Sequence, residues 1–473
     1  MKKSKRFQIY QNTNINVYVT KTAEKKAKKL FVWKRFQQKI ALFRNNPKHS
    51  SLHLEKLEPK DQNRWSIRIN KQYRAILVKT SENTITIYYI GDYHYQSKLV
   101  NQLMKNKQRR KLNIAILFGG RSAEHEVSLQ SAKNIIVALD KEKYNPILIG
   151  IDKKGTWYLY DSSHFLLHAK DPKLITLNKS EQSVVIAGHN KGEIIGLSSL
   201  SLKQHIDVVF PVLHGTYGED GTIQGLLKLA GVPFVGASIL GSAIGMDKDV
   251  MKRLLRDAGI PTARFLVFKK NDKLHFDNIV KQLGLPFFVK PANLGSSVGV
   301  TKVKNHQSFL PAIDEAFQYD RKILVEHYIQ GREIECSVLG NENPITSLPG
   351  EIIVKREFYS YEAKYIDANG VLLQIPASLP PHLTKKVQEL AIKTFRVLCG
   401  EGMARVDFFL KKNGDLVINE INTIPGFTAI SMYPKLWEVS GISYSELIDR
   451  LIQLAFARFK EESLLKTTVS QAT

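Results

Sequence analysis

The sequence predicts an α/β protein that carries a separate, smaller α+β domain at its N-terminus. From Asn113 onward, apolar strand-like runs alternate with helical patterns, which is typical of a parallel sheet covered by helices. Before that point, helical patterning is followed by short β-rich runs in a strongly basic stretch. At 473 residues the chain is also long enough for three or four domains.

Charge is distributed unevenly along the chain. Residues 1–110 hold 26 Lys and Arg against 6 Asp and Glu, a net charge of +20, so subtraction from the total of +25 leaves +5 for residues 111–473. Such a break indicates two modules with different partners. The first module favours polyanions, although a basic domain that only aids solubility would have the same composition.

Composition excludes several classes of protein. A hydrophobic fraction of 43% with 24% charged residues is typical of a globular chain. We find no apolar run near the ~20 residues of a membrane helix, and the N-terminus lacks the apolar core of a signal peptide. Cys336 and Cys399 lie in unrelated contexts, without metal-ligand spacing. These features favour a cytoplasmic protein without disulfides.

Each element follows from a local pattern. Residues 22–47 have helical spacing and end at Asn-Asn-Pro, and three β-rich runs follow at 64–70, 73–80 and 84–93, which together predict helices followed by an antiparallel sheet. Residues 97–111 are polar and basic, as in a linker or a last helix. Strands are then expected at 113–120 and 206–215, each followed by a helix, and more strands at 287–300, 322–329, 333–340, 402–410 and 414–426.

The stretch KPANLGSSVGV, residues 290–300, raises the question of a nucleotide site. Lys290 ends an apolar run and precedes a loop of glycines and serines, whose amides can hold phosphate oxygens. It is not a Walker A loop, because no Gly-Lys-Ser/Thr opens a following helix. Alone, such a loop is more often an ordinary turn.

Two later strands carry polar residues at alternate positions. In ARVDFFL and VINEIN, residues two apart face the same side, which groups Arg405 with Asp407 and Glu420 with Asn422. Two carboxylates and an amide oxygen suit Mg²⁺, whereas two strands that expose polar residues to water would look the same. Lys248, near a predicted helix start, adds a cation suited to phosphate. Together with Lys290 and the Gly-Ser loop, these residues indicate a site for ATP and magnesium.

Seven motifs then occur in the order found in D-alanine–D-alanine ligases, which belong to the ATP-grasp superfamily. The motifs are LFGGRSAEHEVSL, VLHGTYGEDGTIQG, GMDKDVMKRLL, VKPANLGSSVGV, YSYEAKY, ARVDFFL and EINTIPGFTAISMYP. The resemblance covers about residues 113–462. It implies an N-terminal Rossmann-like α/β subdomain at 113–236, a central ATP-grasp subdomain at 237–328, a C-terminal ATP-grasp domain at 329–462 and a tail at 463–473.

The resemblance implies a reaction and a nucleotide site. In this family the carboxylate of one D-alanine attacks the γ-phosphate of ATP, and the amine of a second D-alanine then displaces phosphate from the acyl phosphate, for peptidoglycan precursor synthesis. By similarity, two Mg²⁺ ions (with Mn²⁺ as an alternative) would be held by Asp407, Glu420 and Asn422. ATP would contact Lys248, Lys290, Ser296, Ser297, Glu326 (toward the base) and Glu333 (at the ribose).

The amino-acid site is implied in the same way. Glu124 matches the anchor of the first ammonium group with His214 nearby, Arg405 and the Gly426 amide match an oxyanion hole, and Ser431 matches the contact to the second carboxylate. Tyr365 matches the loop tyrosine that reaches Glu124 through Ser296, where depsipeptide-forming relatives carry phenylalanine. The expected second substrate is therefore D-alanine and not D-lactate.

Residues 1–110 resemble RelE/ParE-type toxins, a family that includes ribosome-dependent mRNA interferases. The resemblance rests on LEKLEPKDQNRWSIRINKQYRAILVK and YYIGDYHYQ, with Arg68, Arg74 and His94 at positions where such toxins often place basic or acid/base residues. It implies RNA, the ribosome or an antitoxin-like peptide as partner. Family members of the ligase type are usually dimers, so a homodimer through that half is expected. Two alternatives remain: another ATP-grasp carboxylate–amine ligase, or a bifunctional protein whose N-terminal domain binds or cleaves RNA.

Overall fold

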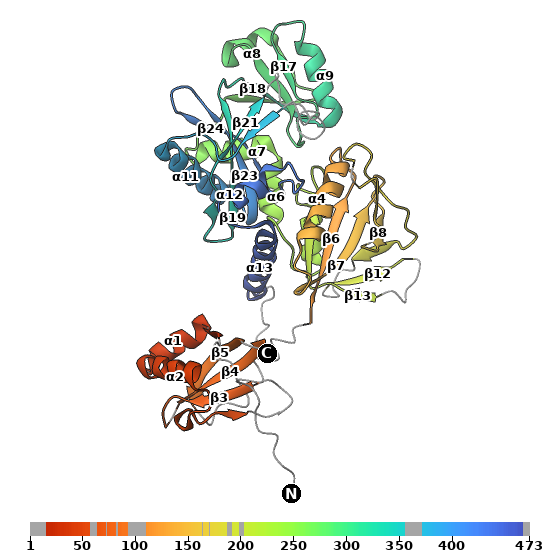
Figure 1. The fold of residues 1–473 in the computed structure, drawn as a ribbon. Coiled ribbons are helices and arrows are strands. Elements are labelled where there is room, and N and C mark those ends of the chain that lie inside the picture. Colours follow the sequence, from red (N-terminus) through yellow and green to blue (C-terminus); the bar gives the residue numbers. More distant parts are fainter. Residues whose placement is uncertain are drawn as a thin grey trace, which may run out of the picture. The chain divides into compact units, whose positions relative to one another are not determined.

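The computed structural model describes residues 16–56, 64–71, 73–81, 84–92, 110–162, 164–169, 171–186, 192–197, 203–354 and 371–466. The chain divides into two compact units, Met1–Arg109 and Arg110–Thr473, and we describe each by itself (Figure 1). A linker or last helix was expected at 97–111, and residues 97–109 of it lie outside the described residues.

The N-terminal unit is a five-stranded sheet in the order β1-β5-β4-β3-β2, with two helices on one side of it (Figure 1). The elements are β1 (Asn16–Val19), α1 (Lys21–Lys29), α2 (Trp33–Asn45), the 3-10 helix η1 (Ser50–Leu52), β2 (Glu55–Lys56), β3 (Arg64–Arg68), β4 (Tyr73–Ser81) and β5 (Thr84–Asp92). Phe36, Ile40 and Phe43 recur at helical spacing on α2 and are buried in one core with Trp65 and Ile67 of β3.

The prediction that this unit begins with helices and has a purely antiparallel sheet is wrong at its first strand. β1 precedes the helices and pairs in parallel with β5, with Asn16 opposite Thr84. A four-residue strand places only two side chains on each face, so alternation cannot distinguish it from a loop. The three predicted strands are present as β3, β4 and β5, which are antiparallel neighbours.

The second unit contains three main sheets. The first has the order β14-β6-β7-β8, in which β14, β6 and β7 are parallel and β8 is antiparallel to β7. Its elements are β6 (Leu112–Gly119), α4 (His125–Ala138), β7 (Tyr144–Ile151), β8 (Trp157–Tyr160), β14 (Val208–Val212) and α5 (Thr222–Leu229). Sequence analysis did not predict the short strands β9 (Leu166–Leu167), β10 (Thr176–Leu177), β11 (Val184–Ile186), β12 (Glu193–Gly196) and β13 (Lys203–His205).

The second and third sheets are antiparallel. The second has the order β15-β18-β16-β17, and its elements are β15 (Phe265–Lys269), α8 (Phe276–Leu283), β16 (Phe287–Pro291), β17 (Thr301–Val303), α9 (Phe309–Tyr319) and β18 (Lys322–His327). The third has the order β22-β21-β19-β23-β24, and β20 also pairs with β19. Its strands are β19 (Arg332–Gly340), β20 (Ile345–Thr346), β21 (Gly350–Val354), β22 (Val371–Gln374), β23 (Gly402–Leu410) and β24 (Leu416–Asn422).

Helices connect these sheets into one unit. They are α6 (Ile239–Met246), α7 (Lys248–Asp257), α11 (Pro381–Val397), α12 (Met432–Val439) and α13 (Tyr444–Ser463). Met251 and Leu255 of α7 are buried in the core of the third sheet, although α7 precedes the second sheet in sequence. Phe210 of β14 meets Phe427 edge to face at 5.9 Å, in a core shared by the first and third sheets. The loop that follows β24 is therefore fixed against the first sheet.

None of the helices in the described ranges has the length and apolar character needed to cross a bilayer.

Candidate active site

Strands β23 and β24 bring four of the predicted site residues together. Arg405 lies opposite Asn422, and Asp407 lies opposite Glu420, so the four share one face of the sheet. The register shifts between Asp407 and Phe408. Such bulges re-aim side chains and are common beside active sites.

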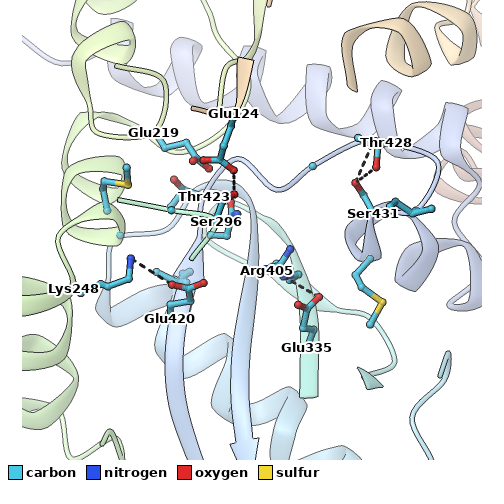
Figure 2. Close-up of a pocket in the computed structure, with 18 of the residues that line it drawn as sticks. Glu124, Glu219, Lys248, Ser296, Glu335, Arg405, Glu420, Thr423, Thr428 and Ser431 are labelled. Atoms are coloured by element: carbon cyan, nitrogen blue, oxygen red, sulfur yellow. Dashed lines mark hydrogen bonds and ion pairs between the residues drawn. The ribbon is translucent and has the colours of Figure 1, made fainter. Parts of the chain in front are cut away.

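Arg405 is held by two carboxylates. Its guanidinium donates hydrogen bonds of 2.8 and 2.7 Å to Asp407. Its Nε also lies 3.0 Å from the carboxylate of Glu335 (Figure 2). Glu335 is on β19, directly opposite Asp407, and sequence analysis did not predict it. A planar guanidinium fixed by two acids presents its remaining donors in a defined direction.

Lys248 begins α7, as the sequence predicted. Asp247 caps this helix by accepting from the amides of Asp249 and Val250, each at 3.1 Å. The Lys248 ammonium donates to the carbonyl of Leu294 at 2.8 Å and lies 3.5 Å from Glu420. It therefore joins the Gly-Ser loop to β24 at a helix N-terminus, where the helix dipole favours a bound anion.

Lys290 takes part in a buried charge cluster. Glu326 of β18 forms short ion pairs with both Lys290 and Lys252, and the Lys252 side chain has no exposure to solvent. Burial acts to raise the pKa of Glu326, but the two ammonium groups hold it below its ordinary value; burial lowers the pKa of Lys252. The carboxylate of Glu326 thus pairs with two lysines, and its expected contact to the adenine base stays a prediction. Lys252 follows Lys248 by four residues on α7, so the two side chains share one helix face. This spacing is the one feature of the sequence that could have indicated a role for Lys252.

The Gly-Ser loop has a strained backbone and contacts the N-terminal end of α4. Ser296 and Ser297 have φ angles of 52° and 59°, a conformation that costs roughly 1–2 kcal/mol for a residue with a side chain. Backbone strain of this kind gathers at ligand sites. The Ser296 hydroxyl donates a short hydrogen bond to Glu124, at the N-terminal end of α4. The further link expected through Tyr365 lies outside the described residues, which stop at 354 and resume at 371.

A second glutamate stands beside Glu124. Glu219 is buried, accepts from the amide of Gly215 at 2.6 Å, and lines the same cavity as Glu124 (Figure 2). Burial, followed by the charge of Glu124, raises its pKa well above the ordinary value. Glu219 lies inside a quoted motif, but sequence analysis did not predict a role for it.

His214 follows the end of β14 by two residues. It is buried, and its ring nitrogens lie 3.0 Å from the carbonyl of Ile424 and 3.2 Å from the hydroxyl of Ser131. Burial lowers its pKa, which favours the neutral ring. The same Ser131 hydroxyl accepts from the amide of Phe427 at 3.1 Å. His214 therefore supports the loop after β24 and does not line the cavity that contains Glu124.

That loop contains the last two predicted residues. A Cβ atom on Gly426 would lie 2.7 Å from the hydroxyl oxygen of Ser431, so the close approach needs glycine. Ser431 immediately precedes α12. Its hydroxyl oxygen accepts from the amide of Thr428 at 2.9 Å and lies 2.8 Å from the Thr428 hydroxyl (Figure 2).

All the predicted site residues except His214 and Tyr365, which lies outside the described residues, line two adjoining cavities. The first is lined by Glu124, Glu219, Ser296, Arg405, Asn422, Gly426 and Ser431, and the second by Lys290, Ser297, Glu326, His327, Glu333 and Asp407. Lys248, Gly295, Ser296, Glu335 and Glu420 line both. Two ligands bound in the two cavities would therefore meet beside the ammonium group of Lys248 and the carboxylates of Glu335 and Glu420.

The metal prediction has partial geometric support. Within the described ranges, no three His, Cys, Asp or Glu side chains are grouped so as to hold an ion. The predicted set contains two carboxylates, opposite one another in the register, and the amide of Asn422, whose oxygen accepts from the Ile424 amide at 3.0 Å. Hard oxygen donors of this kind suit Mg²⁺.

Among the N-terminal residues singled out in the sequence, Arg74 is buried. It is 4% exposed; it donates to Ser66 at 2.9 Å and to the carbonyl of His53 at 2.7 Å, and it pairs with Glu55 at 3.1 Å. These contacts give Arg74 a structural role in the sheet. Arg68 lies beside it in the register, and His94 lies outside the described residues.

Comparison with known families matches both halves of the second unit. A family described as D-ala D-ala ligase N-terminus matches residues 113–237, and one described as D-ala D-ala ligase C-terminus matches residues 254–453. A D-alanine–D-alanine ligase of Oceanobacillus iheyensis is 55% identical over 363 residues, which make up 76% of this chain and 99% of the relative.

Solved structures agree with these matches. The D-alanine–D-alanine ligase of Coxiella burnetii has a TM-score of 0.66 at 41% identity, over 75% of this chain and 96% of that one. The VanG D-Ala:D-Ser ligase of Enterococcus faecalis has a TM-score of 0.65 at 38% identity, over 73% and 100%. A Bacillus anthracis ligase complexed with ATP has a TM-score of 0.56 at 29% identity, over 74% and 99%.

Proposed function

The chain belongs to the D-alanine–D-alanine ligase family, and on this premise we propose that residues 110–473 join two D-alanine molecules with ATP through an acyl phosphate. The relatives favour this reaction over another ATP-grasp ligation or a primarily RNA-directed protein. The observation that carries the proposal is the pair of cavities that share Lys248, Gly295, Ser296, Glu335 and Glu420. One cavity suits amino acids and the other suits a nucleotide.

In the first step, a carboxylate oxygen of one D-alanine attacks the γ-phosphorus of ATP, and ADP leaves. We assign the ammonium group of this D-alanine to Glu124, which is supported by its position in the amino-acid cavity. Ser296 donates to Glu124 and also lines the nucleotide cavity, so one loop touches both reactants. Fixing two reactants in contact supplies much of the rate enhancement in such reactions.

In the second step, the amine of the other D-alanine attacks the acyl carbonyl, loses a proton, and inorganic phosphate leaves. Charge develops on the carbonyl oxygen, and we assign its stabilisation to Arg405 and the Gly426 amide. The carboxylate of the second substrate is assigned to Ser431. All three residues line the amino-acid cavity, which supports these roles.

We assign the phosphates of ATP to Lys248, Lys290, Ser296 and Ser297, and the ribose to Glu333. The support is that all five residues line the nucleotide cavity. Glu326 also lines this cavity, and we assign it to the base. Its ion pairs with Lys252 and Lys290 support an additional role in positioning the phosphate-binding lysine.

Asp407, Glu420 and Asn422 would hold two Mg²⁺ ions, with Mn²⁺ as an alternative, because their donors are hard oxygens on adjoining strands. When bound, the metal would neutralise phosphate charge. Arg405 occupies Asp407 through two hydrogen bonds, so metal binding would compete with that pair. Mn²⁺ titration followed by electron paramagnetic resonance tests the assignment: Glu420→Gln should weaken binding, and binding equal to that of the unaltered protein would refute it.

The second substrate is tested with a panel of D-alanine, D-serine, D-lactate and L-alanine. We expect ADP release that requires D-alanine and yields the dipeptide, since Tyr365 matches the tyrosine of dipeptide-forming relatives. The likeness to a D-Ala:D-Ser ligase makes D-serine the informative competitor. Turnover with D-serine that exceeds turnover with D-alanine would refute the proposed selectivity.

We also propose a homodimer through the second unit. Leu226 and Leu229 of α5 and Ile239 and Leu240 of α6 are 38%, 81%, 39% and 59% exposed, and these helices contact one another. Apolar side chains grouped in this way are typical of an association surface. Leu229→Asp should halve the mass measured by light scattering if this surface is the dimer interface; an unchanged dimer would exclude it.

For the N-terminal unit we propose a RelE/ParE-like polyanion-binding module, with RNA, the ribosome or an acidic peptide as partner. The support is its charge of +20 and its small sheet with two helices. Burial of Arg74 weighs against RNA cleavage at that residue.

We further propose that the second unit is subdivided at 236/237 and 328/329. By these bounds α7 belongs to the central subdomain, and it packs into the core of the third sheet.

A further inference from the structure

The turn between α1 and α2 contains an aromatic residue at a position that normally holds glycine. Phe31 has a φ angle of 55°, and its amide donates to the carbonyl of Lys28 at 3.1 Å. The next amide, of Val32, donates to the carbonyl of Ala27 at 3.0 Å. These two bonds are those of a Schellman motif, in which Phe31 is the left-handed residue that ends the helix.

Phe31 costs this unit stability through its backbone and adds none through its side chain. The left-handed conformation costs roughly 1–2 kcal/mol for a residue with a side chain, and glycine would avoid that cost. The side chain is also 97% exposed, so it contributes nothing to the core. A bulky residue that is both strained and exposed indicates a role other than folding.

The surface around Phe31 is basic. Exposed Lys25, Lys28 and Lys29 precede it on α1, and exposed Lys34 and Arg35 follow it on α2. We call these five residues and Phe31 the hairpin surface. The single acidic residue between positions 21 and 35 is Glu24, which pairs with Lys28 at 2.6 Å. The two helices lie side by side (Figure 1), so the charges and the ring belong to one region of the unit.

We propose that the hairpin surface binds single-stranded nucleic acid, with Phe31 stacking on a base and the surrounding cations contacting phosphates. Positive side chains supply salt-dependent affinity for the backbone, and a projecting ring supplies a stacking surface for an unpaired base. The inference rests on the proposal that this unit binds a polyanion and identifies the surface and the ligand.

Single-stranded nucleic acid fits better than the other polyanions. The bases of a duplex are stacked on one another and do not offer a free face to a side chain. An acidic peptide helix binds through an apolar groove that receives its side chains. Phe31 is almost fully exposed and projects from a turn, so it does not line such a groove.

The test measures fluorescence anisotropy of labelled twelve-nucleotide oligo-U RNA, oligo-dT DNA and a mixed-sequence duplex with the full-length protein, at two salt concentrations. We expect the single strands to bind more tightly than the duplex. Phe31→Gly should weaken single-strand binding about 5- to 100-fold with little change in the salt slope. Lys29→Gln or Lys34→Gln should weaken binding and reduce the slope by about one. The RNA and DNA arms distinguish the two sources of the ligand.

A stability readout separates function from folding. Phe31→Gly should raise the melting temperature of the N-terminal unit while it weakens binding, the opposite of what a folding defect would do. His53→Gly is the matched control, because His53 is also exposed and left-handed, with a φ angle of 42°, but lies outside the hairpin surface. It should raise stability without changing binding.

Each contrary result overturns a different statement. Absence of binding to any nucleic acid would refute both this inference and an RNA partner for the unit. Tight single-strand binding that Phe31→Gly leaves unchanged would refute the hairpin surface but keep the polyanion-binding module. Equal affinity for the duplex would refute base stacking, and poly-glutamate that competes as well as unlabelled RNA would identify an acidic peptide as the partner.

Discussion

The proposed role of Arg405 in catalysis depends on the geometry of its guanidinium as well as on its charge. It forms a two-pronged contact with Asp407 and a third contact with Glu335. Lysine would keep the charge but lose the fixed fork of donors. We expect Arg405→Lys to lower kcat about 100-fold, the usual loss for one oxyanion donor, and to leave ATP affinity within about twofold. Steady-state kinetics and nucleotide titration measure the two quantities.

The matched control for Arg405 is Arg332. Its guanidinium makes a similar pair of hydrogen bonds, of 2.7 and 2.6 Å, to Glu351, but it is not among the residues that line either cavity. Arg332→Lys should therefore leave kcat unchanged. A comparable fall in kcat for both variants would mean that Arg405 supports the third sheet and does not act on the substrate.

Glu219 makes stability depend on pH in a direction that can be worked out. Its pKa in the folded protein is raised well above the ordinary 4.5, chiefly by burial. The folded state therefore keeps a proton that the unfolded state releases, and the resulting stabilisation is full below about pH 4.5 and decreases as pH rises toward the folded pKa. Glutamine cannot ionise. We expect the melting temperature of Glu219→Gln, relative to the unaltered protein, to increase between pH 5 and pH 8.

An exposed glutamate provides the reference for that measurement. Glu389 on α11 has a side chain that is 67% exposed, so Glu389→Gln measures the effect of losing one exposed carboxylate across the same pH range. A difference for Glu219→Gln that does not change with pH would show that its carboxyl is not held protonated in the fold.

At this scale the sequence predicted residue types better than contacts. Lys248 and Lys290 were predicted because each stands beside a recognisable local signal, a helix start and a strand end. Lys252 and Glu219 lie at neither kind of position, and the residues that act on them, Glu326 and Glu124, are distant in sequence and meet them only after folding. The prediction that Glu326 faces the adenine base came from the family resemblance, and its two lysine partners could not be deduced from the sequence.

At the scale of elements, three hydrogen bonds to the backbone N–H and C=O of Phe427 hold the loop after β24; we call these three bonds the clamp. Ser131 accepts from the Phe427 amide at 3.1 Å, while Asn134 and Tyr444 donate to its carbonyl at 2.9 and 2.7 Å. Gly426 precedes this peptide. The proposed oxyanion donor is thus oriented by α4 and α13, which are distant from it in sequence.

The clamp predicts a selective kinetic defect. Ser131→Ala removes the hydrogen bond to the Phe427 amide and the contact with the His214 ring. It should lower kcat about tenfold, because a donor misplaced by a fraction of an ångström loses much of its effect, while KM for ATP stays unchanged. Ser242→Ala is the control: this serine is also buried and bonds a backbone carbonyl, at 3.4 Å from Ala237. An equal loss in both variants would indicate general destabilisation.

Elements were predictable where their patterns were long. The strands at β6 and β14 were expected because each contains an apolar run of five residues that ends near a glycine. The strands at β23 and β24 were expected as strand-like runs with polar interruptions. β1 and the strands from β9 to β13 are two to four residues long, and pairing with neighbours defines them. The antiparallel order of the second and third sheets also depends on contacts distant in sequence, which strand-by-strand patterns do not contain.

For the whole molecule, the charge break and the division into units coincide. The boundary lies between Arg109 and Arg110, and Arg110 pairs with Asp207 of the second unit through two hydrogen bonds of 2.8 Å. Residues 110–473 carry +6, the +5 of residues 111–473 with Arg110 added. This stretch also contains every residue assigned to catalysis, so we expect catalysis to proceed without the basic unit.

Separate expression of residues 110–473 should therefore preserve the ligase and remove the affinity for polyanions. We expect kcat/KM for D-alanine within twofold of the full-length protein, because relatives of this length are complete ligases and this stretch spans 99% of one of them. On a heparin column the full-length protein should elute at higher salt, since it carries 19 additional net positive charges. A large gain in kcat/KM on removal of residues 1–109 would instead reveal that the N-terminal unit inhibits the enzyme, and a large loss would show that it completes the active site.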